Sequence, residues 1–345
     1  MKLNKKKTTM GVLATTGAAI VPIFAVVSCG KDIPTLTAKG SSTVLPFMQG
    51  FSKKYDGAQV NVAGGGSGAG QKAILMGEVD FGNMSATPDS KEIVNSDKFR
   101  TVTVGIDGLA MVIKGNSKKA KIDNILKLYT EEKGNKQWLL AAKAIFGMDA
   151  NANNVEVLSR ENPDKSGTAE IFGIGLGKLS GTGQNRVSHH PKKSELKGVT
   201  STTNEANSEA FKSLSGSSKK YGITYLSLGV ADSLIKGKSN FSKLTLISND
   251  GKHKMIPNKE NVGKTYNWAR PLNVIYNTKA NNKQDVINFI EGMMSEGQKS
   301  LANVGYLKLT DEQKKSEGIL KNDDKEFLES NKTNGHNGLA IDIKW

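Results

Sequence analysis

Three short polar runs carry the residues best suited to chemistry, and each run leads into a segment that can be helical. They are residues 40–46 (GSSTVLP), residues 64–70 (GGGSGAG) and residues 166–168 (SGT). The first turn of a helix leaves backbone N–H groups unpaired, so a helix start that also carries a hydroxyl can bind a small anion. Three such starts from separate parts of one chain predict a site that surrounds an oxyanion.

A cationic partner for that site is available just before the third run. Arg160 ends a predicted strand at residues 155–160, and a guanidinium offers a planar fork that matches an oxyanion. Two ordinary explanations stay open at this point. Isolated arginines are commonly surface charges, and hydroxyls before a helix are commonly N-caps with no ligand.

The glycine run does not have the spacing of a nucleotide-binding loop. That loop requires Gly-x4-Gly-Lys-Ser/Thr, whereas here Gln71 separates Gly70 from Lys72 and Ala73 follows the lysine. An NTPase is therefore not expected. A flexible linker is the alternative, although the run stands between a predicted strand and a predicted helix.

Residue patterns typical of catalysis are weak elsewhere. The histidines have no HExxH spacing and no cysteine partner, which argues against a zinc site. Pairs of carboxylates fall in charged stretches that we interpret as solvated surface. We therefore expect no enzyme, no metal site and no cofactor. The histidines are His189, His190, His253 and His336, and the carboxylate pairs include Glu131-Glu132 and Asp323-Asp324.

The N-terminal segment has the pattern of a bacterial lipoprotein signal. Four lysines lie among residues 2–7, an apolar stretch covers residues 10–27, and Val26-Val27-Ser28-Cys29 has the residue order of a lipoprotein cleavage site. We predict a signal peptide at residues 1–28, lipid on Cys29 and a tether at residues 29–34. An uncleaved transmembrane anchor is the alternative, since the apolar stretch is nearly long enough to span a bilayer.

Length and composition restrict the remaining possibilities. The chain has 345 residues and a formal charge of +15, which falls to +11 without the four signal lysines. Cys29 is the only cysteine, so no internal disulfide is possible. The length suggests two domains. Aromatic residues are only 6% of the chain, and no arginine-rich run alternates with them, so nucleic-acid binding is not expected. The positive charge would favour capture of anionic solutes or contact with an anionic membrane.

Strand-like and helix-like segments alternate through the chain, which predicts an α/β fold. Apolar residues recur at helical spacing after Thr43 and between residues 284 and 296, whereas residues 173–220 are rich in Gly, Ser, Asn and Lys. We expect surface loops with one or two helices in that last region. The predicted strands cover residues 36–38, 59–63, 79–82, 102–106, 109–113, 155–160, 222–226 and 268–276.

An ordered set of segments resembles the phosphate-binding lipoproteins of bacterial phosphate ABC importers, which have the type II periplasmic-binding-protein fold. Each segment alone is weakly specific, but their order and spacing cover most of the chain after the signal. The segments are residues 40–46 (GSSTVLP), 65–74 (GGSGAGQKAI), 79–85 (VDFGNMS), 106–113 (IDGLAMVI), 166–168 (SGT), 222–226 (GITYL), 269–276 (ARPLNVIY) and 297–306 (GQKSLANVGY).

The resemblance implies an architecture of two α/β lobes joined by two hinge crossovers, with the ligand in the cleft. Residues 106–113 and 269–276 would be the hinge strands. Lobe 1 would consist of residues 35–108 and 272–345, and lobe 2 of residues 109–271. The lobes would close over one dehydrated phosphate and deliver it to a membrane permease.

The resemblance also implies a set of phosphate ligands. In this sequence they are hydroxyls, backbone amides and one guanidinium, and they fall on Ser42, Thr43, Val44, Ser67, Ser85, Arg160, Ser166, Gly167 and Thr168.

Two features depart from the family pattern. Some members carry an aspartate at the position of Ser85, where it accepts the proton that phosphate has and sulfate lacks, so its absence weakens that discrimination. Arg160 also lies six residues before Ser166, a longer spacing than is usual in the family.

We therefore expect a monomeric, lipid-anchored protein at the extracytoplasmic face of the cell membrane that binds inorganic phosphate and serves an ABC permease. A binder of another oxyanion, such as sulfate or a phosphorylated small molecule, is one alternative. A surface adhesin built on a degenerate binding fold is another.

Overall fold

The computed structural model describes residues 33–41, 43–88, 90–204, 206–317, 338–339, 341 and 343–345. Contacts divide the chain into two units, residues 1–33 and residues 34–345, and the fold described below is that of the second unit. The predicted signal peptide and Cys29 lie outside the described residues, as does Ser42.

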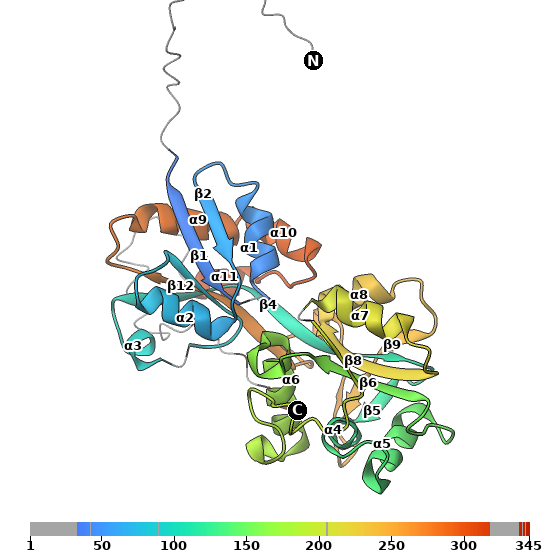
Figure 1. Cartoon of the computed structure of the whole chain (residues 1–345). Helices are drawn as coiled ribbons and strands as arrows, with labels where there is room; N and C mark the ends of the chain where they lie inside the picture. Colours follow the sequence, from blue (N-terminus) through green and yellow to red (C-terminus); the bar gives the residue numbers. More distant parts are fainter. Residues whose placement is uncertain are drawn as a thin grey trace, which may run out of the picture. The chain divides into compact units, whose positions relative to one another are not determined.

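One group of elements, here called the first lobe, comes from both ends of the described chain (Figure 1). Helices α1 and α2 in this lobe begin where the first two polar runs predicted them. The elements are β1 (Thr35–Gly40), α1 (Leu45–Ser52), β2 (Gln59–Ala63), α2 (Ser67–Leu75), β3 (Phe81–Met84), α3 (Lys91–Val94), β12 (Ala269–Asn277), α9 (Lys283–Met294), α10 (Gly297–Asn303) and α11 (Asp311–Ser316).

The second lobe is formed by the middle of the chain, and its helix α6 begins at the third polar run. Strand β4 (Phe99–Lys114) is shared by both lobes. The remaining elements are β5 (Lys119–Lys121), α4 (Ile122–Thr130), α5 (Lys136–Phe146), β6 (Val155–Arg160), η1 (Pro163–Lys165), α6 (Gly167–Ser180), η2 (Gly183–Asn185), β7 (Ser201–Thr203), α7 (Asn207–Gly216), β8 (Tyr221–Ser227), α8 (Leu228–Ile235), β9 (Phe241–Lys243), β10 (Thr245–Ile247), β11 (Lys254–Met255) and η3 (Lys259–Asn261).

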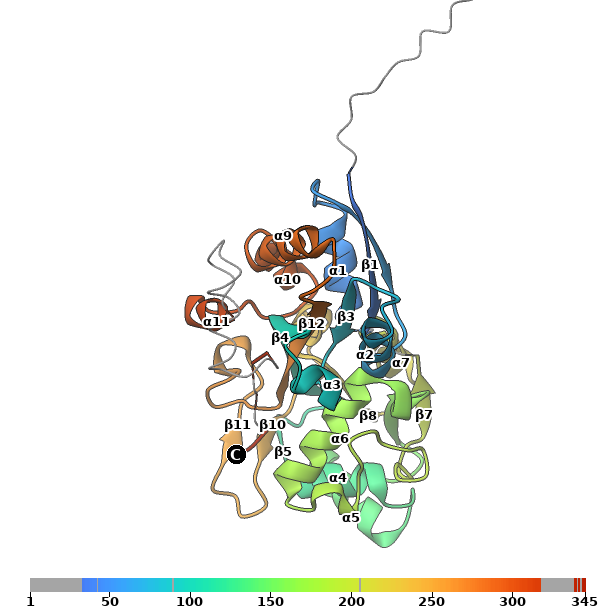
Figure 2. The same cartoon turned by 90° about the vertical axis from the view of Figure 1, so that its left-hand side faces the viewer.

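The main sheet is mixed and has the strand order β2-β1-β3-β12-β4-β8-β6-β7, with β9 also paired to β4. Its two ends are parallel, whereas β12 and β4 run antiparallel to their neighbours in the middle. Strands β11, β10 and β5 form a smaller sheet. Figure 2 shows the helices of each lobe lying against the strands of that lobe.

Strand β4 links the lobes through a change of partner along its length. Its residues up to Gly108 pair with β12, and those from Leu109 onward pair with β8 and β9. All but its last residue are buried. The sequence predicted two separate strands here, but the alternating first half and the apolar second half form one continuous strand because both lobes cover it.

Each lobe has its own apolar core. In the first lobe Phe51, Phe81 and Phe289 pack together, with centroids of Phe51 and Phe289 5.2 Å apart. In the second lobe Phe172 stacks on Tyr225 at a centroid distance of 4.1 Å. Burial of each such ring contributes about 1.5–3 kcal/mol. Two separate cores on one shared sheet confirm the predicted two-lobe α/β architecture.

The region at residues 173–220, predicted to hold surface loops with one or two helices, contains the end of helix α6 and all of helix α7. Helix α6 runs on to Ser180, where Gly181 ends it in the left-handed conformation (φ 77°). The glycines of α6 are packing positions rather than breaks. A Cβ on Gly175 would lie 2.0 Å from Nε1 of Trp268, which donates a hydrogen bond to the Ile171 carbonyl.

The described C-terminal residues cross from one lobe to the other. The Leu339 N–H donates to Thr103 Oγ1 at 2.7 Å, and Leu339 packs against the core of the first lobe. Ile343 is buried in the core of the second lobe, and Trp345 Nε1 donates to the Leu179 carbonyl at 2.7 Å. Among the described residues, no helix has both the length and the apolar character needed to cross a bilayer.

Candidate functional site

The turn after β1 places a hydroxyl at the start of α1. Ser41 Oγ accepts hydrogen bonds from the backbone N–H groups of Thr43 (3.1 Å) and Val44 (3.3 Å). Thr43 has a buried side chain, and its carbonyl accepts a hydrogen bond from the Tyr306 hydroxyl at 2.6 Å. The Val44 N–H, which was predicted to bind phosphate, therefore donates to Ser41 in this structure. Ser41 was absent from the predicted ligands.

Two further hydroxyls meet Ser41 from other loops. Ser67 is the first residue of α2, and Ser85 follows β3. Ser85 Oγ lies 2.9 Å from Ser41 Oγ and 3.3 Å from Ser67 Oγ, which also accepts the Ser85 backbone N–H at 3.1 Å. Three segments distant in sequence thus bring their hydroxyls to one point.

Arg270, at the start of β12, is the centre of this cluster. Its Nη1 donates to Ser85 Oγ at 3.3 Å and to the Gly167 carbonyl, and its Nη2 donates to Thr43 Oγ1 at 2.9 Å. The residue is 4% exposed. One buried guanidinium therefore joins two loops of the first lobe to the start of α6 in the second lobe.

The charge of Arg270 is balanced by Asp107 on the neighbouring strand β4. Asp107 Oδ2 accepts hydrogen bonds from Nη2 at 3.0 Å and from Nε at 3.2 Å. Burial raises the pKa of the Asp107 carboxyl, and the adjacent guanidinium offsets part of that rise. Asp107 thus orients Arg270 so that Nη1 and part of Nη2 face the hydroxyl cluster.

The start of α6 completes the site. Ser166 Oγ accepts the Ala169 N–H at 2.9 Å and so acts as the N-cap of the helix. Gly167 lies so close to the cluster that an added Cβ would be 2.8 Å from Ser85 Oγ and 3.2 Å from Arg270 Nη1. A side chain there would therefore force the Ser85 hydroxyl or the Arg270 guanidinium to move. Thr168 is buried next to it.

The structure does not bring Arg160 into this cluster. Its Nη2 donates to Asn207 Oδ1 at 3.0 Å and to the Tyr225 carbonyl at 3.1 Å, and its guanidinium lies 5.0 Å from the centre of the Tyr225 ring. The side chain is 1% exposed. Arg160 therefore lies in the interior of the second lobe. It contacts Asn207, which lines the pocket described next.

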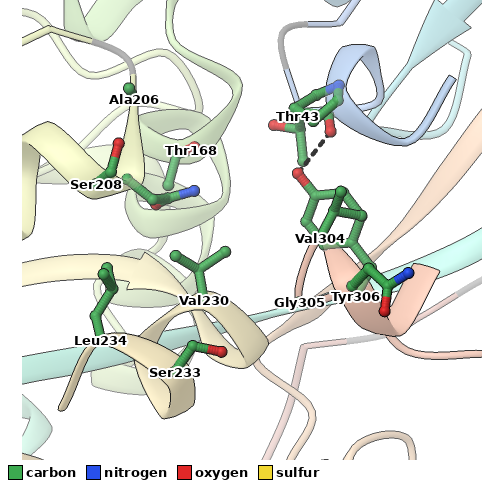
Figure 3. A pocket seen from close by; sticks show the side chains of 13 residues that line it. Thr43, Thr168, Ala206, Ser208, Val230, Ser233, Leu234, Val304, Gly305 and Tyr306 are labelled. Carbon is green, nitrogen blue, oxygen red and sulfur yellow. Dashed lines mark hydrogen bonds between the residues drawn. The ribbon is translucent and has the colours of Figure 1, made fainter. Parts of the chain in front are cut away.

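A pocket of about 340 Å³ opens beside the cluster, and it is here called the neutral pocket. Thr43 and Tyr306 of the first lobe line it together with Thr168, Asn207 and Ser208 of the second lobe. Figure 3 shows Thr43 and Tyr306 facing Thr168 and Ser208 across this space. None of the residues that line it is charged.

Of the predicted ligands within the described chain, four are brought together directly: Thr43, Ser67, Ser85 and Gly167. Val44, Ser166 and Thr168 lie next to these four in sequence, whereas Arg160 is elsewhere. Sequence reasoning missed Arg270 and Asp107. A signal was available, because each is a lone charge in an otherwise apolar segment, a placement that is rare in buried strands unless the charge is paired.

The arrangement is suited to holding an anion through hydrogen bonds. It offers a guanidinium, several hydroxyls and the N-termini of α2 and α6, whose first amides have no partner within the helix. Among the described residues, no group of three or more His, Cys, Asp or Glu side chains could hold a metal ion.

Comparisons with known proteins give a matching family model and similar proteins. A family model described as a PBP superfamily domain matches residues 26–296. An uncharacterised lipoprotein of Mycoplasma genitalium, MG412, is 28% identical over 82% of this chain and 85% of its own length. The phosphate-binding protein PstS of Bacillus subtilis is 27% identical over 41% of this chain and 46% of its own length.

A crystal structure has the same fold. It is an ABC-type phosphate transport receptor from Vibrio cholerae, which superposes with a TM-score of 0.57 at 22% identity. The match covers 79% of this chain and all of that one.

Proposed function

This chain belongs to the PBP superfamily, and on that premise we propose that it is an extracytoplasmic solute-binding protein that captures inorganic phosphate for an ABC importer. The observation that carries the proposal is the contact set of Arg270, which donates to Ser85 and Thr43 of one lobe and to Gly167 of the other. An anion bound at this position would contact both lobes at once. The phosphate specificity named for two of the similar proteins supports the choice of ligand.

Phosphate would replace contacts that the protein now makes with itself. The Arg270 Nη atoms donate to hydroxyl and carbonyl oxygens, and phosphate oxygens are stronger acceptors because the resulting bonds are charge-assisted on both sides. The displaced hydroxyls of Thr43 and Ser85 would then donate to the ligand. We assign the guanidinium role to Arg270 instead of Arg160, whose Nη2 donates to Asn207 and to the Tyr225 carbonyl within the second lobe.

Closure of the lobes would strengthen the binding. Arg270 and Asp107 are almost completely buried, and hydrogen bonds from such groups gain strength as water is excluded. The ligand would be held and released without any bond being made or broken, so the proposal involves no catalysis.

We further propose that the protein is a monomer held by lipid on Cys29 at the outer face of the cell membrane, where it meets its permease. The sequence pattern at residues 26–29 supports the lipid anchor, as does the name lipoprotein given to the relative from Mycoplasma genitalium. Mass spectrometry of the N-terminal peptide would test it, and an unmodified Cys29 in protein from membranes would contradict it.

Isothermal titration of the chain from Lys31 onward with phosphate and with sulfate tests the ligand assignment. We expect one phosphate per chain with a dissociation constant near ~1 μM or lower, and a weaker interaction with sulfate. Tighter binding of sulfate would assign the site to another oxyanion. If neither anion binds at millimolar concentration, the proposal fails, and a degenerate site in an adhesin becomes the better account.

A further inference from the structure

A second pocket, of about 400 Å³, adjoins the same cluster and differs from the neutral pocket in charge. It is here called the charged pocket. Ser85 and Arg270 line its buried end, and Lys178, His189 and His190 line its exposed rim. Glu170 also lines it and lies 3.8 Å from His190 Nε2, so it offsets part of the positive charge.

Apolar side chains also line the charged pocket. Ile171 and Ile174 of α6 form one wall, and Ile341 and Ile343 of the C-terminal segment form another. The pocket therefore combines buried groups that can bind an anion with apolar side chains and exposed nitrogen donors. The neutral pocket has no charged residue in its lining.

The volume exceeds what inorganic phosphate needs. At about 400 Å³ the charged pocket has more than ten times the ~30 Å³ that one water molecule occupies in the liquid. It falls in the ~300–1,000 Å³ range of pockets for small organic ligands. A tetrahedral anion at Arg270 would leave most of this space unfilled.

We propose that the site also accepts a phosphate monoester of a small polyol, with its phosphoryl group at Ser85 and Arg270 and its carbon skeleton in the charged pocket. This inference rests on the proposed function of the same site. A monoester keeps three terminal oxygens for the hydroxyls and the guanidinium, and its fourth oxygen carries the organic group. That group passes between the isoleucines, and its hydroxyls reach the donors at the rim.

Titration with glycerol 3-phosphate and with inorganic phosphate tests the inference, using the chain from Lys31 onward, which contains the whole compact unit of residues 34–345. The variant Ile174→Trp places a large side chain in the charged pocket without altering Ser85 or Arg270. The matched control is Ser208→Trp, which places the same side chain at an exposed position in the neutral pocket.

Both ligands should bind the unmodified protein in competition with each other. Ile174→Trp should lower the affinity for glycerol 3-phosphate by about tenfold or more, equivalent to ~1.4 kcal/mol. The affinity for inorganic phosphate should stay within about threefold of its original value. Ser208→Trp should change neither affinity.

The alternative outcomes are distinguishable. Binding of inorganic phosphate without glycerol 3-phosphate overturns the inference and leaves the proposed function standing, whereas failure of both ligands removes the two together. If Ser208→Trp selectively loses binding of glycerol 3-phosphate, the organic group lies in the neutral pocket. That result would overturn the assignment of the organic group to the charged pocket. If Ile174→Trp lowers the affinity for both ligands, the variant His190→Ala is the second test. The inference holds only if His190→Ala lowers the affinity for glycerol 3-phosphate and not that for inorganic phosphate.

Discussion

Arg270 and Asp107 stand opposite each other in the antiparallel pair β12 and β4, the strands at the junction of the two lobes. Their Nη2 and Oδ2 atoms are 3.0 Å apart, and the side chains are 5% and 1% exposed. The pair therefore fixes a cation at the point where the lobes meet. Asp107 Oδ2 accepts hydrogen bonds from Nε and Nη2, whereas Nη1 donates to Ser85 and to the Gly167 carbonyl.

Removal of the guanidinium should harm both stability and binding. Arg270→Ala leaves the Asp107 carboxylate buried without its partner, which typically costs about 3–5 kcal/mol. Urea unfolding would measure that loss, and titration would show no phosphate binding. The double variant Arg270→Met with Asp107→Leu is the control, because it removes both charges. It should recover most of the stability and still not bind phosphate, and recovery of binding would contradict the role of Arg270.

The two buried arginines can be separated by conservative replacement. Arg270→Lys keeps the charge but loses the planar fork, so phosphate affinity should fall by about 10–100-fold, or ~1.4–2.8 kcal/mol. Arg160→Lys alters contacts with Asn207 and Tyr225, so it should lower the melting temperature and leave the phosphate affinity within about threefold. The opposite result would return the ligand role to Arg160.

A side chain at Gly167 should displace the groups that we expect to bind phosphate. A Cβ at this position would lie 2.8 Å from Ser85 Oγ, so Gly167→Ala should lower the affinity for phosphate by about tenfold or more. Gly50→Ala is the matched control, because the added Cβ meets nothing within 4 Å in helix α1. That change should leave binding intact and stabilise the protein by about 0.5–1 kcal/mol. Equal affinities for the two variants would be evidence against close approach at Gly167.

The residue at position 85 should control discrimination between phosphate and sulfate. Ser85→Asp introduces a carboxylate that can accept the proton of phosphate but is left unpaired and repelled by sulfate. The ratio of phosphate to sulfate affinity should rise by about tenfold or more. Ser85→Asn has a similar shape without the charge, so it should not raise the ratio. Titrations with both anions measure it, and an unchanged ratio in Ser85→Asp would place the ligand away from Ser85.

Glu317 should make stability depend on pH. Burial raises the pKa of its carboxyl to about 7 from the ordinary 4.5, although the Thr103 N–H donates to Oε2 at 2.9 Å and Arg100 lies near. The folded chain thus holds this proton more tightly than the unfolded chain. Stability from this group is fully present below pH 4.5 and falls, by up to ~3 kcal/mol, as pH rises to about 7.

Urea unfolding at pH 5 and pH 8 tests this effect. Glu317→Gln keeps an uncharged side chain of the same size and should reduce the stability difference between the two pH values. Asp107 shifts in the same direction, so the comparison is between the variant and the unmodified chain. An identical difference in both proteins would show that Glu317 does not titrate in this range.

The helix starts of the site were predictable because their signals are local. Polar caps and glycines before apolar periodic segments correctly placed the beginnings of α1, α2 and α6. The hydroxyls of Ser41, Ser67 and Ser85 converge because they follow β1, β2 and β3. Strand β1 runs parallel to both of its neighbours, so the three loops share one edge of the sheet.

The central cation could not be found in that way, because its role depends on contacts far apart in sequence. Arg270 pairs with Asp107, 163 residues earlier, through the register of β12 against β4. Arg160 lies closer in sequence to Ser166 of the third run, yet its side chain contacts Asn207 and Tyr225. Short distance along the chain therefore pointed to Arg160, although this side chain does not reach the cluster. Successive side chains of a β-strand point to opposite faces, so closeness in sequence does not fix which face a side chain lies on.

A crystal structure of the chain from Lys31 onward, grown with saturating phosphate, would test the arrangement most directly. We expect one tetrahedral ion with oxygens within hydrogen-bond distance of Arg270, Ser85 and Thr43 and of the amides that begin α6. Phosphate bound only at surface lysines, with Arg270 still donating to Ser85 and the Gly167 carbonyl, would contradict the account.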